Sequence, residues 1–206
     1  VEVLMAPGFD DDALELLTKK EKIRILLNRE RRRFNPGELD YRRVTGGLLV
    51  QDRDRSSEGR EHMTVVTEAK PSDDQWDDIL FSWLVAKHVK SNAIVFTRGR
   101  QTIGIGAGQM SRVDSTRLAT EKAAIAGLST EACIVASDAF FPFPDGPLTA
   151  LDAGATVIVQ PGGSIRDDAV IEAVNERGTS ATSDTATPKA ETRPESPSTA
   201  CTVYRP

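Results

Sequence analysis

The sequence has few of the residues on which disulfides and metal sites depend. Among 206 residues there are two cysteines and two histidines. Cys133 and Cys201 lie far apart and form no C-x-x-C pair, which predicts reduced thiols in a cytoplasmic protein. The H-x-E and P-C-x-x-C motifs of zinc-dependent nucleobase deaminases are missing from the sequence. We therefore expect no catalytic zinc.

Long apolar runs and an excess of positive charge are also missing. No apolar run approaches the roughly 20 residues that span a bilayer, and no signal peptide is visible. The formal net charge is −5, whereas proteins that bind nucleic acids usually carry a basic surface. The basic run from Arg29 to Arg33 is interrupted by Glu30 and fits a solvated edge better than a phosphate site. We expect neither a nucleic-acid partner nor a membrane.

What the chain does contain is an alternation of strand-like and helix-like segments. Apolar runs predict strands at 1–6, 22–27, 48–51, 62–67, 92–97, 101–105, 134–137 and 156–160. Helical spacing and capping residues predict helices at 10–20, 72–90, 111 or 114 to 127, 147–153 and 167–177. This alternation predicts a layered α/β/α architecture.

The two ends of the chain differ from its middle. A strand with core character that begins at Val1 leads us to expect further sequence upstream. From Thr179 the chain is rich in Thr, Ser, Pro and Ala, which predicts a disordered tail over 179–206. We therefore divide the chain into 1–70, 71–178 and the tail.

Three glycines at alternate positions precede the segment Gln109-Met-Ser-Arg112. Gly104, Gly106 and Gly108 do not match the dinucleotide pattern G-x-G-x-x-G, because the third glycine comes one position early. The remaining interpretations are a tight turn into a helix and a turn that faces an anionic or heterocyclic ligand. We favour the ligand-facing turn.

Three other segments are candidates for binding. Asn92, between a helix and a strand, is either a turn former or a donor and acceptor for an amide-bearing substrate. The aromatic segment from Phe140 to Phe143 is bracketed by Asp138 and Asp145, which suits a wall for a flat heterocycle better than a core alone. In the loop 160–168, a Ser164–Asp167 capping box and backbone N–H groups that face a ligand are both possible.

Several segments in order resemble one family, the bifunctional AICAR formyltransferase/IMP cyclohydrolases. They are Val1–Asp10, Thr45–Asp52, Asp78–Trp83, Lys90–Val95, Thr102–Arg112, Ala136–Phe143 and Gln160–Asp168. The match is to the C-terminal part of the formyltransferase domain and covers about residues 1–178. It implies a cytidine-deaminase-like fold without zinc, in which 1–70 ends a first subdomain and 71–178 forms a second. It also implies a homodimer with shared active sites.

The resemblance further implies a reaction and its residues. The family transfers a formyl group from 10-formyltetrahydrofolate to AICAR on the way to IMP. By position, Asn92 is expected to hold the reacting amine and carboxamide, Gly46 to lie against the nucleotide, and Arg112 to contact ligand near the folate. The residues expected to line the pocket and its folate end are Phe140, Phe141, Pro142, Phe143 and Asp145. Asp138, with Ser91 nearby, is expected beside a potassium ion.

The sequence also departs from the family pattern. The family's base lies in a Lys-His-x-Asn-Pro-x-Gly segment, and Lys87-His88 matches only its first two residues. Pro144 stands where relatives usually have Arg, the cyclohydrolase domain is missing, and the tail is unrelated. We therefore expect weak or no turnover and the loss of a central strand. The alternatives are a non-catalytic folding or dimerisation fragment and, from the glycine turn alone, a nucleotide-cofactor oxidoreductase.

Overall fold

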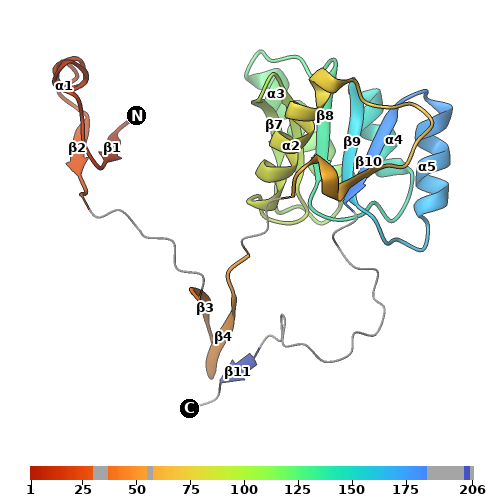
Figure 1. The fold of residues 1–206 in the computed structure, drawn as a ribbon, viewed down its shortest axis with the longest axis horizontal. Helices are drawn as coiled ribbons and strands as arrows, with labels where there is room; N and C mark the ends of the chain where they lie inside the picture. Colours follow the sequence, from red (N-terminus) through yellow and green to blue (C-terminus); the bar gives the residue numbers. More distant parts are fainter. Residues whose placement is uncertain (30–36, 55–57, 185–201, 205–206) are drawn as a thin grey trace. The chain divides into compact units, whose positions relative to one another are not determined.

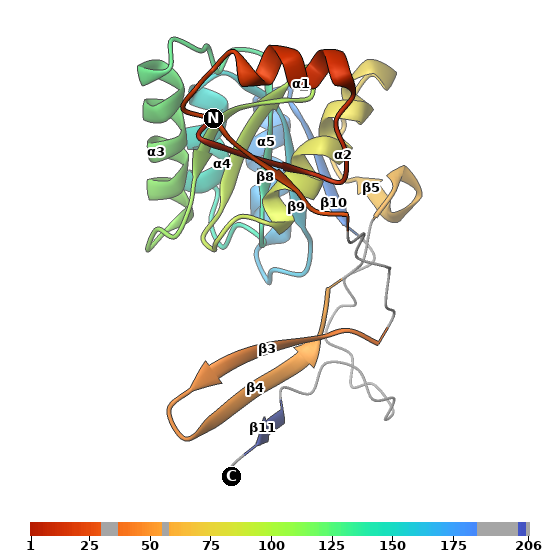
Figure 2. The same cartoon turned by 90° about the vertical axis from the view of Figure 1, so that its left-hand side faces the viewer.

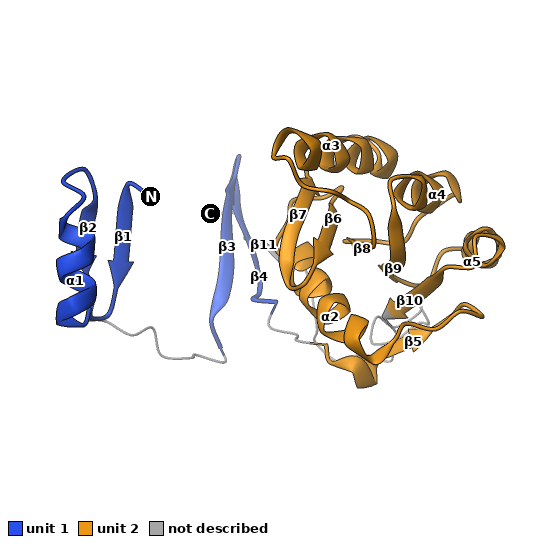
Figure 3. Cartoon of the chain, turned by 90° about the horizontal axis from the view of Figure 1, so that it is seen from above, with its two compact units in different colours: residues 1–54, 197–206 blue, residues 55–196 orange. Residues whose placement is uncertain are grey.

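The computed structural model describes residues 1–29, 37–54, 58–184 and 202–204. The chain forms two compact units, 1–54 with 197–206 and 55–196, and each is considered by itself (Figure 3). The boundary that the sequence suggested, between residues 70 and 71, falls inside the second unit. It lies between strand β5 (Met63–Val65) and helix α2 (Asp73–Lys87), and β5 already belongs to the sheet of that unit.

A six-stranded mixed sheet with the order β5-β10-β9-β8-β6-β7 forms the centre of the second unit. Its other strands are β6 (Ile94–Arg98), β7 (Gln101–Gly106), β8 (Cys133–Ser137), β9 (Ala155–Pro161) and β10 (Ser180–Asp184). Strands β8, β9 and β10 run parallel to one another. Strand β6 is antiparallel to both of its neighbours, and β5 is antiparallel to β10. Parallel neighbours need crossover connections, and helices provide them.

Helices cover both faces of this sheet (Figures 1 and 3). Helix α2 lies on one face, and α3 (Arg112–Ile125), α4 (Asp145–Asp152) and α5 (Asp167–Glu176) lie on the other. Side chains that alternate along β6 enter different cores, Val95 on the α2 side and Ile94 and Phe96 on the opposite side. The predicted layered α/β/α architecture is therefore confirmed. None of the described helices is long and apolar enough to span a bilayer.

Two of the three alternate glycines let β7 pack closely on α3. A Cβ atom on Gly104 would collide with the carbonyl oxygen of Ala119, and one on Gly106 with that of Ser115. Only Gly108, with φ of +68°, adopts a backbone conformation that favours glycine. For Gly104 and Gly106 the favoured ligand-facing interpretation is wrong, because their bare faces lie against a helix. The oxidoreductase alternative rested on this motif and loses its support.

Strand β10 lies within the segment that composition predicts to be disordered. Its residue Thr182 is paired with Val159 of β9 on one side and with Val65 of β5 on the other. Ala181 is buried, and its N–H donates to Thr67 Oγ1 at 2.7 Å. The prediction of disorder is wrong for Ser180–Asp184, and the expected loss of a strand from this sheet is not observed. Composition alone does not show that neighbouring strands on both sides form backbone hydrogen bonds with this segment.

The first unit contains small sheets with little burial. Strands β1 (Val3–Ala6) and β2 (Arg24–Leu27) pair in parallel and are connected through helix α1 (Asp11–Thr18). Strands β3 (Leu39–Val44) and β4 (Gly47–Asp52) form a hairpin (Figure 2), and β11 (Thr202–Tyr204) pairs with β4. None of the residues 1–29 and 37–54 is buried. Strand β3 is not evident from the sequence, because its apolar residues alternate weakly and it carries charge.

Candidate functional site

Four connecting segments meet at one edge of the six-stranded sheet. Strands β7, β8, β9 and β10 run toward this edge. The antiparallel β6 begins there, and its Ile94 is paired with both Gly106 of β7 and Ser137 of β8. The segments at the edge are 91–93, 107–111, 138–144 and 162–166. In α/β sheets the carboxyl ends of parallel strands are the usual place for ligands. The sheet thus brings the candidate residues of the second unit to one place.

Asn92 lies just before β6 and is fixed on two sides. Its Nδ2 donates to the carbonyl oxygen of Gln109 at 2.9 Å, and its own carbonyl accepts from Ser115 Oγ at 2.7 Å. No residue described here donates a hydrogen bond to its Oδ1, and the side chain is half-buried. Asn92 is therefore a turn residue that keeps one acceptor available, so the two interpretations of this position are compatible.

Arg112 and Asp138 form a half-buried ion pair beside Asn92. Arg112 Nη2 lies 3.5 Å from Asp138 Oδ1, and the two side chains are 15% and 16% exposed. Arg112 Nε also donates to Ser137 Oγ at 3.1 Å and to the carbonyl of Ala139 at 3.3 Å. Asp138 Oδ1 in turn accepts the N–H of Ala93 at 2.8 Å. This network ties the start of β6, the start of α3 and the end of β8 together.

The aromatic segment after β8 divides into exposed and buried rings. Phe140 is 40% and Phe143 46% exposed, and Pro142 is exposed as well. Phe141 is fully buried in the core, where its ring lies against Gly146 of α4. Phe140 and Phe143 can therefore present ring faces to a ligand, whereas Phe141 contributes packing. Asp145 is exposed in the first turn of α4, and its Oδ1 accepts the N–H of Gly146 at 2.9 Å.

The loop after β9 approaches the aromatic segment. The guanidinium of Arg166 lies over the Phe143 ring, 4.6 Å from its centroid. The proposed Ser164–Asp167 capping box is not formed, because α5 begins at Asp167 and Ser164 Oγ accepts from Arg166 N–H at 3.1 Å. Asp167 Oδ2 instead accepts the N–H of Gly163 at 2.7 Å. That N–H is therefore already used within the loop.

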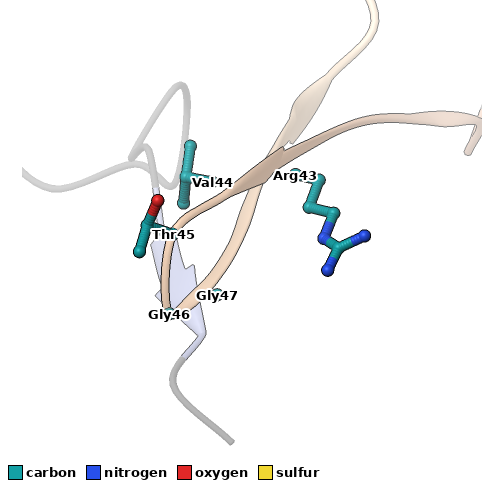
Figure 4. Close-up of a pocket in the computed structure, with 5 residues that line it drawn as sticks. All are labelled: Arg43, Val44, Thr45, Gly46 and Gly47. Carbon is teal, nitrogen blue, oxygen red and sulfur yellow. The ribbon is translucent and has the colours of Figure 1, made fainter.

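Gly46 belongs to the first unit and is described there by itself. It lies in the turn between β3 and β4 with φ of +83°. A hollow of about 750 Å³ surrounds this turn and is lined by Arg43, Val44, Thr45, Gly46 and Gly47 (Figure 4). The Arg43 side chain extends to one side of the hairpin, and those of Val44 and Thr45 extend to the other. All five lining residues belong to the β3–β4 hairpin.

Comparison with known proteins places the chain in a family. Residues 1–122 match the model described as AICARFT/IMPCHase bienzyme. The chain belongs to the AICARFT/IMPCHase family. It is 49% identical over 175 residues to the bifunctional purine biosynthesis protein PurH of Chlorobium phaeobacteroides (strain BS1). The aligned part makes up 85% of this chain and 33% of that relative, so the chain spans about one third of the relative's length.

The AICARFT/IMPCHase model and the site overlap only in part. Gly46, Asn92 and Arg112 lie inside the matched range, whereas the aromatic segment from Phe140 lies beyond it. Sequence reasoning missed the supporting residues Ser115 and Ser137, because single serines within predicted helices and strands carry no distinctive signal. The Ser137 hydroxyl donates to the carbonyl of Ala139 at 2.7 Å and accepts from Arg112.

Proposed function

We propose that the second unit carries the substrate-orienting part of a formyltransferase site that serves purine biosynthesis. The reaction would transfer a formyl group from 10-formyltetrahydrofolate to the 5-amino group of AICAR. Membership of the AICARFT/IMPCHase family supports this reaction, and the relative PurH supports the pathway. The observation that carries the proposal is the meeting of Asn92, Arg112 and the exposed rings of Phe140 and Phe143 at one sheet edge.

The chemistry requires an oriented amine. The nitrogen is a poor nucleophile because its lone pair is delocalised into the ring and carboxamide. As it bonds to the formyl carbon it gives a proton to a base, and N10 of tetrahydrofolate takes up a proton and leaves. Asn92 Oδ1 is free to accept an N–H of the amine or carboxamide, and the hydrogen bond from Nδ2 to Gln109 holds it in position.

The remaining edge residues suit binding and charge stabilisation. Arg112, which is expected to contact ligand near the folate, would supply positive charge for the oxyanion that develops on the formyl oxygen. Phe140, Pro142 and Phe143 offer apolar surface to the two flat ring systems, Phe141 would act through its backbone, and Asp145 is expected at the folate end. We assign Gly46 to the nucleotide by family position only.

A potassium ion near Asp138 and Ser91 also remains a proposal. Asp138 Oδ2 accepts no hydrogen bond from the described residues, so one carboxylate oxygen could bind a monovalent cation together with Ser91. Such an ion would balance charge near the substrate. A homodimer that shares active sites is likewise proposed from family membership.

Low turnover is expected from this chain because it contains no Lys-His-x-Asn-Pro-x-Gly segment. His88, exposed directly after α2, is the histidine closest in sequence to Asn92. Substrate binding without efficient transfer is therefore the expected behaviour. It would also fit the alternative of a non-catalytic fragment that folds or dimerises.

The test is to titrate the purified chain with AICAR by calorimetry and to follow tetrahydrofolate formation from 10-formyltetrahydrofolate. We expect binding with weak or no turnover, and a loss of affinity of about tenfold in Asn92→Ala. Gln101→Ala is the matched control, because Gln101 is exposed at the opposite end of β7. No binding by the unmodified chain, or unchanged affinity in Asn92→Ala, would contradict the proposal.

A further inference from the structure

Gln160 is a buried polar residue near the end of β9, and the proposed reaction assigns it no role. It is 4% exposed, on a strand that otherwise carries apolar residues into the two cores. Its Oε1 accepts the N–H of Phe141 at 2.8 Å. A buried glutamine in such a place is expected to have its hydrogen-bonding groups satisfied.

The hydrogen bond to Phe141 fixes which end of the amide faces which way. A backbone N–H can only donate, so the oxygen of Gln160 must point toward Phe141 and its NH₂ group must point away. The NH₂ group has no hydrogen-bond partner among the described residues. Among the described residues, the fully buried side-chain atoms that lack a hydrogen-bond partner do not include this nitrogen. The nitrogen therefore reaches accessible space.

The position of Gln160 identifies this space as the edge already described. Ile158, two residues earlier on β9, points into the core that contains Phe141, and Gln160 lies on the same face of the strand. The loops that follow β8 and β9 meet here, as the contact between Arg166 and Phe143 shows. The NH₂ group of this nearly buried side chain is therefore well placed to donate a hydrogen bond to an acceptor atom of a bound ligand.

We propose that Gln160 determines ligand specificity at this edge: its Oε1 positions the aromatic segment, and its Nε2 donates a hydrogen bond to a carbonyl oxygen of the bound substrate. This inference rests on the proposed function. AICAR and 10-formyltetrahydrofolate both carry carbonyl groups, so the shared chemistry is a neutral oxygen acceptor, and separate titrations distinguish the two sources.

Gln160→Glu tests the donor with little change of shape. A carboxylate keeps an oxygen for the Phe141 N–H but loses the NH₂ group. When protonated, however, the carboxyl regains a donor, and burial favours the protonated form. We therefore expect the affinity of one substrate to fall about tenfold or more relative to the unmodified chain at pH 8, and this ratio to recover toward pH 6. Measuring the unmodified chain at each pH removes the effect of substrate ionisation.

Gln160→Met is the second variant, in case the glutamate variant unfolds. It keeps the length of the side chain and removes both hydrogen bonds, so we expect it to bind weakly at every pH. Thermal unfolding of each unliganded variant shows whether it is folded. Affinity at pH 8 like that of the unmodified chain in either folded variant would overturn the inference, as would a loss in Gln160→Glu that does not change with pH. If the unmodified chain binds neither substrate, the proposed function fails and this inference fails with it.

Discussion

The two units of the chain use similar apolar runs with very different results. In the first unit, Met5 is 59% and Leu16 65% exposed, although they lie in a strand and a helix. In the second unit, Val95 and Val159 are fully buried in comparable strands. The difference is the number of layers, because helices cover both faces of the six-stranded sheet in the second unit. An apolar run thus predicts a strand, but its burial depends on what packs against it.

The contrast has an energetic consequence. A two-stranded sheet is marginal in water, whereas a larger sheet between helix layers buries enough apolar surface to be stable. Matched substitutions in the two units therefore test this difference in stability. They follow in order of expected effect on the second unit.

The largest effect is expected from Phe141→Ala. Phe141 is fully buried, so removal of its ring should lower the free energy of unfolding by about 3–5 kcal/mol. Leu16→Ala in the first unit is the control and should change it by less than about 1 kcal/mol. Urea unfolding monitored by circular dichroism provides the measurement. Equal losses would show that the first unit has a core of its own.

A smaller effect is expected from Gly106→Ala. The added Cβ would meet the carbonyl of Ser115, so β7 and α3 must move apart, with a loss of about 1–3 kcal/mol in the free energy of unfolding. Gly8→Ala in the first unit meets nothing within 4 Å and is the matched control. The same unfolding experiment applies. A neutral Gly106→Ala would contradict close packing of this strand on the helix.

Asp78→Ala should cost less again. The carboxylate accepts the N–H groups of Gly99 and Arg100, both at 2.6 Å, and so fastens α2 to the turn between β6 and β7. Loss of these bonds is expected to lower the free energy of unfolding by about 1–2 kcal/mol. Asp40, exposed on β3, is the control position. Similar losses for Asp78→Ala and Asp40→Ala would show that the two hydrogen bonds to Asp78 contribute little to stability.

The smallest perturbation is chemical labelling of Cys133. Burial raises the pKa of this thiol, so at pH 8 less of it is thiolate than in an exposed cysteine, and access is blocked as well. In a Cys201→Ser background, we expect slow reaction with a thiol reagent in the native state and fast reaction in urea. Leu16→Cys in the same background should add a site in the first unit that reacts fast without urea. Rapid native labelling of Cys133 would contradict the buried core.

Because the raised pKa favours the neutral thiol in the folded state, Cys133 also affects stability at high pH. The contribution of the neutral thiol to the free energy of unfolding is complete below the pKa of the unfolded thiol, about 8.5. It is lost as the pH rises through the higher pKa that the thiol has in the folded state.

Most elements of the second unit could be predicted from the sequence. Trp76 and Ile79 have helical spacing, the cap at Ser111 is formed, and its Oγ accepts the N–H of Asp114 at 3.1 Å. Strands β3, β10 and β11 are not evident from the sequence. Ser180–Asp184 is polar and small, and it becomes a strand because β9 and β5 supply partners on both sides.

The candidate site was only partly accessible to the same reasoning. Asn92 and Arg112 stand out as polar residues beside glycines, but their support by Ser115 and Ser137 depends on distant parts of the chain. The position of Phe141 in the core, between two exposed phenylalanines, also cannot be read from a run of aromatics. Spacing shows where functional groups occur, whereas burial shows which of them can meet a ligand.

The pairing of β5 with β10 has a consequence for the order of assembly during synthesis. β5 is the first strand of the sheet to leave the ribosome, and β10 is the last. Since β5 is hydrogen-bonded in this sheet only to β10, a nascent chain that has not yet reached Ser180 cannot anchor its first strand. Translation must therefore run through the last strand before the sheet can close, and until then β5 and the outer edge of β9 stay unpaired.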